Sequence, residues 1–194
     1  MVGNNAVGSW DYLGLKVGPL PNPKEKKWEE QGGLTNLKGW LIWGEKKKLW
    51  FRKKWKVTAK GEFESFTVTL GGNADTTITD DGKTVRQHEY HHVKLFRDNW
   101  EKARKAANNL EWTYCHEPCA DIAEELMNWY GNYYFASAML ENDQFDMDVY
   151  GYRMGVEQKT KTQNRMNDQR GHKRDAARKI RELIRKWKTE KCPR

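Results

Sequence analysis

The residues best suited to chemistry form one short segment, His88-Glu89-Tyr90-His91-His92, which is an H-E-x-x-H motif. The segment falls in the first turns of a helix predicted over residues 84–109, where His88 and His92 lie about 40° apart around the axis. Two imidazoles on one helix face are suited to binding Zn²⁺. Glu89 is then placed to take a proton from a water that the metal activates. We therefore interpret His88 and His92 as zinc ligands, Glu89 as the catalytic base, and His91 as exposed or behind the ligands.

A catalytic zinc site needs a third protein ligand, and the sequence offers candidates in the acidic segment 141–151. If the helix that carries the motif and the next helix form an antiparallel hairpin turning near residue 113, this segment returns to the histidines. We predict Asp146 as the third ligand, with Asp148 as the first alternative. Glu125, with its neighbour Glu124, ranks third because the hairpin places both near the far end of the first helix.

The pair Phe145-Asp146 followed by Tyr150-Gly151 resembles a later motif in two groups of H-E-x-x-H proteases. That motif is Gly-Thr-x-Asp-x-x-Tyr-Gly in the deuterolysin-like aspzincins and Tyr-Asp-x-x-Thr-x-His-Gly in a family of predicted secreted zinc proteases. The match to the aspzincin motif is incomplete. Asp146 lies one residue too far from Tyr150 for the aspzincin spacing, and Asp148 lies one residue too near to it. The Gly-Thr pair of that motif is missing. The resemblance implies a zincin-like peptidase with an aspartate ligand, and it places Tyr150 near the oxyanion.

The pattern of apolar residues predicts an α+β fold. It consists of a small, mostly antiparallel sheet, the H-E-x-x-H helix, a second long antiparallel helix and a basic C-terminal helix. Strand-like alternation extends from Leu37 to Leu70, and we expect Phe66–Leu70 to be the edge strand that zincins place before the metal helix. Asp80-Asp81-Gly82 predicts a turn and a helix start. Apolar spacing predicts the two later helices from Pro118 to about Phe145 and over 172–189.

The first 15 residues resemble the end of an RHS-repeat core. Such cores commonly close with Val-Gly-Asn-Asn-Pro followed by Asp-Pro-x-Gly-Leu, and here Ala6 and Tyr12 stand where proline is usual. The matching residues of the second part are Asp11, Gly14 and Leu15. In that family the core forms a shell, and self-cleavage just after this motif frees a variable C-terminal toxin.

This resemblance implies a domain organisation and a setting. Residues 1–15 would close the core and carry the self-cleavage motif, residues 16–36 would be a linker, and residues 37–194 would be a zincin-like toxin domain. The toxin would be secreted or delivered into a target cell as part of a larger RHS protein. Its partners would be a protein substrate, the RHS shell of the parent chain and a cognate immunity protein.

The net charge of +8 conceals blocks of opposite sign. Residues 24–60 carry +8, residues 61–155 carry −9 and residues 156–194 carry +9. We interpret the basic blocks as charged surfaces that partly neutralise the acidic middle, and we do not expect a nucleic-acid partner. The composition, with 37% apolar residues and 10 Trp, supports a folded core. The sequence shows no apolar run long enough to span a membrane, and no signal peptide is visible in it.

Two further interpretations stay open for the site. His91 and His92 are similar to the paired histidines of HNH-type nuclease toxins, which a strand over 86–93 followed by a loop would favour. The second interpretation is a non-catalytic domain that keeps a degenerate zincin scaffold. The lack of a third ligand near the histidines would favour this interpretation.

Three cysteines leave three alternatives. Cys115 and Cys119 could close a small disulfide loop, could bind zinc together with His116, or could be buried or free thiols, as could Cys192.

Overall fold

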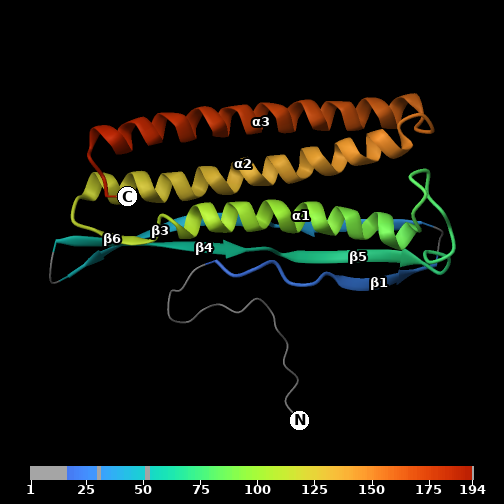
Figure 1. The fold of residues 1–194 in the computed structure, drawn as a ribbon, viewed down its shortest axis with the longest axis horizontal. Coiled ribbons are helices and arrows are strands. Elements are labelled where there is room, and N and C mark those ends of the chain that lie inside the picture. The colour runs from blue at the N-terminus through green and yellow to red at the C-terminus, as the bar shows by residue number, and fades with distance from the viewer. Residues whose placement is uncertain (1–16, 30–31, 51–52, 194) are drawn as a thin grey trace, which may run out of the picture.

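The computed structural model describes residues 17–29, 32–50 and 53–193. Within that part of the chain, strands and helices form an α+β arrangement, as the sequence predicted (Figure 1). The elements are, in chain order, β1 Lys24–Trp28, β2 Gly33–Lys38, β3 Leu41–Leu49, β4 Lys54–Glu62, β5 Ser65–Gly71, α1 Val85–Asn108, β6 Trp112–Tyr114, α2 Glu117–Tyr150 and α3 Val156–Thr189.

Four strands form one long hairpin under the helices. β2 and β3 follow each other along one arm, and β4 and β5 return along the other. The β2–β5 pairing continues the register of the β3–β4 pairing without a shift, with Lys38 opposite Ser65 and Leu41 opposite Glu62. β1 adds to β5 in parallel, and β6 adds to β4 antiparallel, so the strands are mostly antiparallel as predicted.

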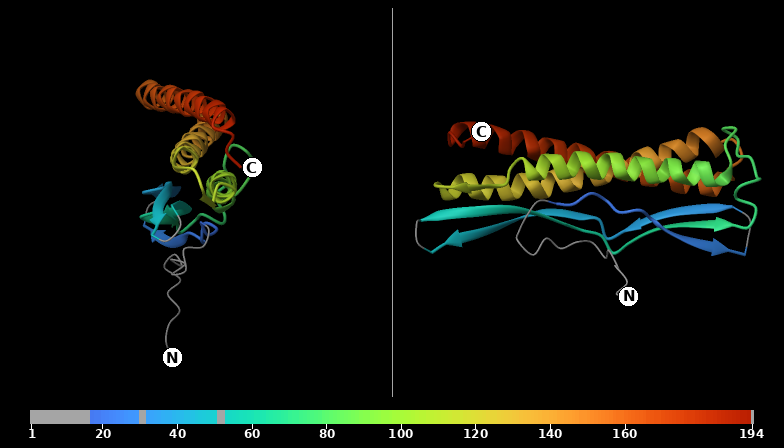
Figure 2. Two further views of the ribbon diagram at one scale, coloured as in Figure 1. Left: turned by 90° about the vertical axis from the view of Figure 1, so that its left-hand side faces the viewer. Right: turned by 60° about the horizontal axis from the view of Figure 1, so that its bottom comes forward.

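The helices cover the strands in two layers (Figure 2). α1 and α2 lie side by side and antiparallel against the hairpin, and α3 packs on the outer side of α2. α2 and α3 each contain 34 residues, which is about 51 Å of helix, so they extend along most of the hairpin. Within the described ranges α3 packs mainly against α2, with one ring contact between its Trp187 and Tyr114 of β6, so most of its circumference faces solvent.

The start of α1 follows from its local sequence. Thr84 caps the helix by accepting a hydrogen bond from the Gln87 backbone N–H at 3.2 Å, and the Gln87 side chain accepts one from the Thr84 N–H at 3.0 Å. This capping box satisfies two donors that a helix start otherwise leaves unpaired. The predicted turn at Asp80–Gly82 precedes it, and Gly82 has the positive φ of 74° that favours glycine.

Close backbone packing fixes α2 against the hairpin. A Cβ atom at Gly44 of β3 would lie 2.7 Å from the Glu124 Cα of α2, and a Cβ atom at Gly131 of α2 would collide with the Ile42 carbonyl oxygen. Larger residues would push the helix away from the sheet. The two glycines therefore help to set how far α2 lies along the hairpin, and hence where its C-terminal end meets α1.

Two segments are more regular than the sequence indicated. The predicted linker 16–36 is wrong, because it contains β1 and most of β2. All five residues of β1 are exposed, so this strand has no apolar alternation by which a sequence pattern could reveal it. α3 begins at Val156 rather than near residue 172. The sequence pattern does not reveal the first half of this helix, because that half buries only Thr162 and Met166 and so lacks a clear apolar stripe.

Two boundaries also differ from expectation. α2 continues to Tyr150, five residues beyond the predicted end at Phe145. The segment Phe66–Leu70 is a strand, but it is not an edge, because β5 lies between β1 and β2. β2 is the edge strand next to α1, a position created by the parallel pairing of β1 with β5 across a long sequence separation.

The disulfide joins the first turn of α2 to the C-terminal end of the described chain. Cys119 pairs with Cys192, with 5.5 Å between their Cα atoms. The suggested Cys115–Cys119 loop is therefore wrong, and so is the suggested zinc site with His116. Cys119 points inward and is buried, whereas Cys115 is a free, exposed thiol.

The RHS-like segment 1–15, with Asp11, Gly14 and Leu15, lies outside the described residues. None of the helices in the described ranges combines the length and the apolarity that crossing a bilayer requires.

Candidate metal centre

The antiparallel packing of α1 on α2 brings the start of α1 beside the end of α2 (Figure 1). His88 and His92, one turn apart on α1, both face α2 and are almost fully buried. Asp146 faces them from the last two turns of α2. The hairpin of helices that the sequence predicted thus places residues 54 to 58 positions apart in direct contact.

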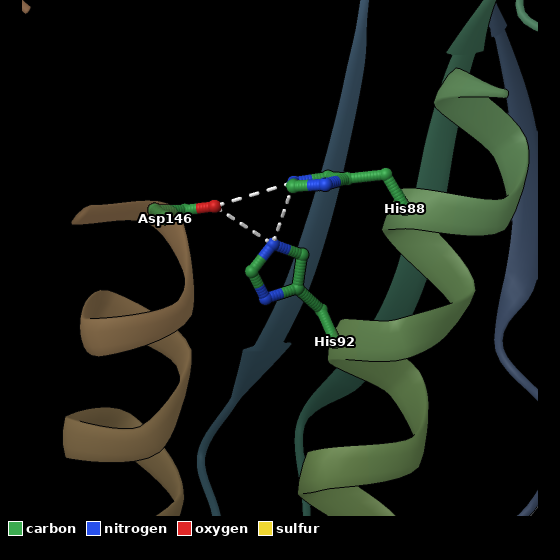
Figure 3. Close-up of side chains that lie close together, drawn as sticks. All are labelled: His88, His92 and Asp146. Atoms are coloured by element: carbon green, nitrogen blue, oxygen red, sulfur yellow. Dashed lines mark hydrogen bonds and ion pairs between the residues drawn. The ribbon is translucent and has the colours of Figure 1, made fainter. Parts of the chain in front are cut away.

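Three ligand atoms converge between the two helices (Figure 3). Asp146 Oδ1 lies 2.9 Å from His92 Nε2 and 3.3 Å from His88 Nε2, and the two Nε2 atoms lie 3.3 Å apart. Tetrahedral ligands bound to zinc at 2.0–2.1 Å are separated from one another by roughly 3.3 Å. The spacing of these three atoms therefore fits one zinc ion, and two imidazoles with one carboxylate are a zinc donor set.

The second nitrogen of each imidazole bears on which nitrogen is free for a metal. Asn142 Nδ2 donates to the Ala138 carbonyl at 2.7 Å, which turns Asn142 Oδ1 toward His92 Nδ1 at 2.6 Å. With a metal bound, a proton on Nδ1 would complete that bond and leave the Nε2 lone pair for the metal. His88 Nδ1 is buried without a hydrogen-bond partner in the described part of the chain and lies 4.0 Å from Asp81 Oδ2.

The electrostatics favour a charged carboxylate at this point. Burial acts to raise the pKa of Asp146, but hydrogen bonds with His88 and His92 outweigh it and hold that pKa at about 2. Burial acts to lower the pKa of His92, but Asp146 and Glu89 raise it above its usual value. The two imidazoles thus surround a carboxylate that stays ionised at neutral pH, which is the state that binds a metal cation.

Glu89 occupies the same pocket on the side of β2. Its Oε2 accepts a hydrogen bond from the Thr35 hydroxyl at 2.8 Å, and the same hydroxyl lies 3.0 Å from the Glu89 carbonyl oxygen. A Cβ atom at Gly33 would lie 2.5 Å from Glu89 Cγ, so only glycine leaves room for this side chain. Burial raises the pKa of Glu89, against the opposing effects of Thr35 and His92. A raised pKa suits a carboxylate that must accept and return a proton near neutral pH.

A cavity of about 700 Å³ contains the cluster. Its walls come from the edge strand β2, the start of α1, the end of α2 and the start of α3. Tyr150 lines it, with its ring centroid 5.0 Å from that of His88, and burial raises the pKa of Tyr150 to about 12. Its hydroxyl is therefore protonated at neutral pH and is able to donate a hydrogen bond.

The other candidate residues lie away from the cluster. Asp148 is exposed on another face of α2 and accepts a hydrogen bond from Gln144 at 2.7 Å. Glu125 is exposed near the opposite end of α2, and neighbouring Glu124 accepts a hydrogen bond from the Lys46 backbone N–H. Neither acidic alternative reaches the histidines.

The two remaining histidines of interest are also separate. The His91 ring stacks on Phe145, with 4.1 Å between centroids, and it does not belong to the converging group. Phe145 also stacks on His88 at 4.8 Å, so one phenyl ring packs against both imidazoles. His172 is exposed on α3.

Several residues around the site were not identified from the sequence. No sequence motif marks Thr35, Gly33 or Asn142, and each is an ordinary residue type for its strand or helix. Asn142 lies four residues before Asp146, which places it on the same face of α2, and this spacing is the one signal that could have indicated it.

The comparisons with known proteins add no relative. The sequence matches no protein-family model, and searches among curated proteins and among solved structures found no similar chain.

Proposed function

We propose that this chain is a zinc-dependent metallopeptidase with a zincin-like arrangement of sheet and helices. His88, His92 and Asp146 hold Zn²⁺, and Glu89 is the catalytic base. The observation that carries the proposal is the convergence of two buried imidazole nitrogens and the half-buried Asp146 carboxylate beside Glu89, in a cavity large enough for a substrate segment. A carboxylate outside the ligand set but next to it is what hydrolysis by a metal-activated water requires.

Zinc, when bound, supplies a Lewis acid and lowers the pKa of a water molecule to about 7. Glu89 takes the proton of the attacking water and then passes it to the leaving amine. The Thr35 hydroxyl keeps the Glu89 carboxylate in one orientation through the 2.8 Å hydrogen bond. Tyr150, neutral and in the same cavity, donates a hydrogen bond to the oxyanion that forms at the carbonyl.

The edge strand β2 supports a peptide substrate over a small one. Residues 32–36 line the cavity, and β2 pairs only with β5 in the described ranges, so its other edge has free backbone groups. An extended peptide that adds to this edge would place its backbone along the row that contains Gly33 and Thr35. Those two residues contact Glu89, so the bound peptide would pass next to the base.

The setting of this activity is part of the same proposal. The RHS-like segment 1–15 favours a peptidase that is the toxin domain of a larger secreted protein, released by self-cleavage near Asp11, Gly14 and Leu15. Such a toxin acts on a protein of the target cell and requires an immunity protein in the producer.

The two other interpretations have less support. Residues 86–93 are helical, whereas an HNH-type site using His91 and His92 would be favoured by a strand there. A non-catalytic scaffold would be favoured by the lack of a third ligand, and Asp146 lies within 3.3 Å of both histidines.

The proposal is tested by measuring zinc content and cleavage of denatured protein substrates together, on the parent chain and on Glu89→Gln. We expect about one zinc per chain in both and proteolysis only in the parent, because Gln keeps the shape of the side chain but cannot accept the proton. Equal proteolysis by both proteins, or DNA cleavage with Mg²⁺ and no bound zinc, would contradict it.

A further inference from the structure

The long helix α3 has two solvent-facing flanks of different charge. At 100° per residue, Arg170, Arg174, Arg178, Arg181, Arg185 and Lys188 fall within about 80° of arc. They recur at spacings of three and four and form a row, here called the arginine row, that extends about 27 Å along the helix. All are exposed except Arg170, which is half-buried.

The acidic residues of α3 all lie on the other flank. They are Glu157, Asp168, Asp175 and Glu182. Two of them neutralise neighbouring lysines on that flank. Lys161 pairs with Glu157 at 2.6 Å, and Lys179 and Lys186 both pair with Glu182. On this flank the carboxylates offset the positive charge of the lysines, whereas the arginine row has no acidic residue of α3 among its positions.

The arginine row has little compensation of its own. Among the described residues, only Arg178, at its border, contacts a carboxylate, that of Asp175 at 3.4 Å. The other five members make no ion pair within the described ranges. Arg165 and Gln158, which line the cavity of the candidate metal centre, lie on the acidic side, so the arginine row faces away from that cavity.

Contrary to the expectation from the charge blocks of the sequence, we propose that the arginine row is a binding surface for the phosphate backbone of a nucleic acid. Five of the six cations are arginines, whose planar fork binds phosphate oxygens in a bidentate way. Over about 27 Å a nucleic-acid strand presents roughly eight phosphates at 3.4 Å per charge. A straight row of regularly spaced cations matches a ligand with regularly spaced anions. The block charge of +9 for residues 156–194 conceals this row because it averages both flanks.

The surface fits a membrane or a folded acidic protein less well. A helix that lies in a membrane interface inserts its apolar face, but the apolar face of α3 is packed on α2. A protein interface is usually anchored by buried aromatic or aliphatic side chains, and the six positions of the row supply none. The contact would bring the chain to a nucleic acid and leave the metal centre open on the other side of α3.

The inference is tested with the full chain and a 20-base-pair DNA duplex, by fluorescence anisotropy between 50 and 200 mM salt. Six phosphate contacts predict that log K falls against log salt with a slope of about −5, or roughly 10³-fold over this range. In the triple variant Arg174→Ala, Arg181→Ala, Arg185→Ala, the slope should fall to about −3, or about 40-fold.

A matched control removes three cations from the other flank, as Lys161→Ala, Lys179→Ala, Lys186→Ala. It changes net charge equally and should keep the parent slope. Equal losses in both triple variants would overturn the arginine row in favour of net charge. Absence of DNA binding, or equal competition by polyglutamate, would overturn the nucleic acid as its ligand. Zinc binding and proteolysis do not enter the assay, so its result is independent of the proposed peptidase.

Discussion

The hydrogen bond between Asn142 and His92 offers a quantitative test of how the ligands are held. Replacing Asn142 with Leu keeps a side chain of similar size but removes the oxygen that lies 2.6 Å from His92 Nδ1. Losing such a partner of a ligand histidine typically weakens metal binding 10- to 100-fold, which is about 1.4–2.7 kcal/mol. Because His92 is buried, its unpaired Nδ1–H should also lower the free energy of unfolding by about 1–3 kcal/mol.

Zinc affinity of Asn142→Leu is measured by competition with a chelator of known affinity, and stability by chemical unfolding without zinc. The control is Asn142→Asp, which keeps an acceptor oxygen toward His92 Nδ1 and should retain zinc binding, although it loses the donor to the Ala138 carbonyl and should be less stable without zinc. A folded Leu variant that bound zinc with parental affinity would show that Asn142 does not orient His92.

Three other changes give separable results. Gly33→Ala should lower kcat by about two orders of magnitude with zinc content unchanged, since its methyl group displaces the Glu89 carboxylate; unchanged proteolysis would contradict the packing. Tyr150→Phe should lower kcat 10²- to 10³-fold without altering KM or zinc affinity, and an effect on KM alone would assign Tyr150 to substrate binding. The Cys119–Cys192 disulfide joins residues 73 positions apart, so reducing it should lower the free energy of chemical unfolding by up to about 4 kcal/mol. Zinc affinity should persist, because the metal centre lies about 40 Å from the disulfide along α2. Loss of zinc on reduction would show that the disulfide and the metal centre are coupled.

The sequence predicted the central part of the site because local and helical rules apply there. The spacing of His88 and His92 depends only on helix geometry, and the contact with Asp146 depends on two antiparallel helices of roughly known length. The sequence could not decide whether Asp146 or Asp148 is the ligand, because the position of the turn between the two helices was uncertain by a few residues. The 100° rotation per residue then decides the matter, since it turns Asp148 to the solvent side.

The strands around the site were harder to predict than the helices. β1 is entirely exposed and pairs in parallel with β5, more than 40 positions away in sequence, so neither alternation nor a turn signal marks it. As a result, the sequence pattern alone indicates β5 as an edge and does not reveal β2, the actual edge, most of which lies in the predicted linker. Thr35 and Gly33 were missed for the same reason, because their roles arise from long-range packing against Glu89.

The proposed function depends on zinc binding by His88, His92 and Asp146 together. The most direct measurement is zinc titration, by isothermal calorimetry, of the parent chain, Asp146→Ala and Asp148→Ala. We expect one tight site in the parent and in Asp148→Ala, and a loss of at least 100-fold in affinity in Asp146→Ala, because three protein ligands become two. Equal zinc affinity in all three proteins, or loss of the site in Asp148→Ala alone, would contradict it.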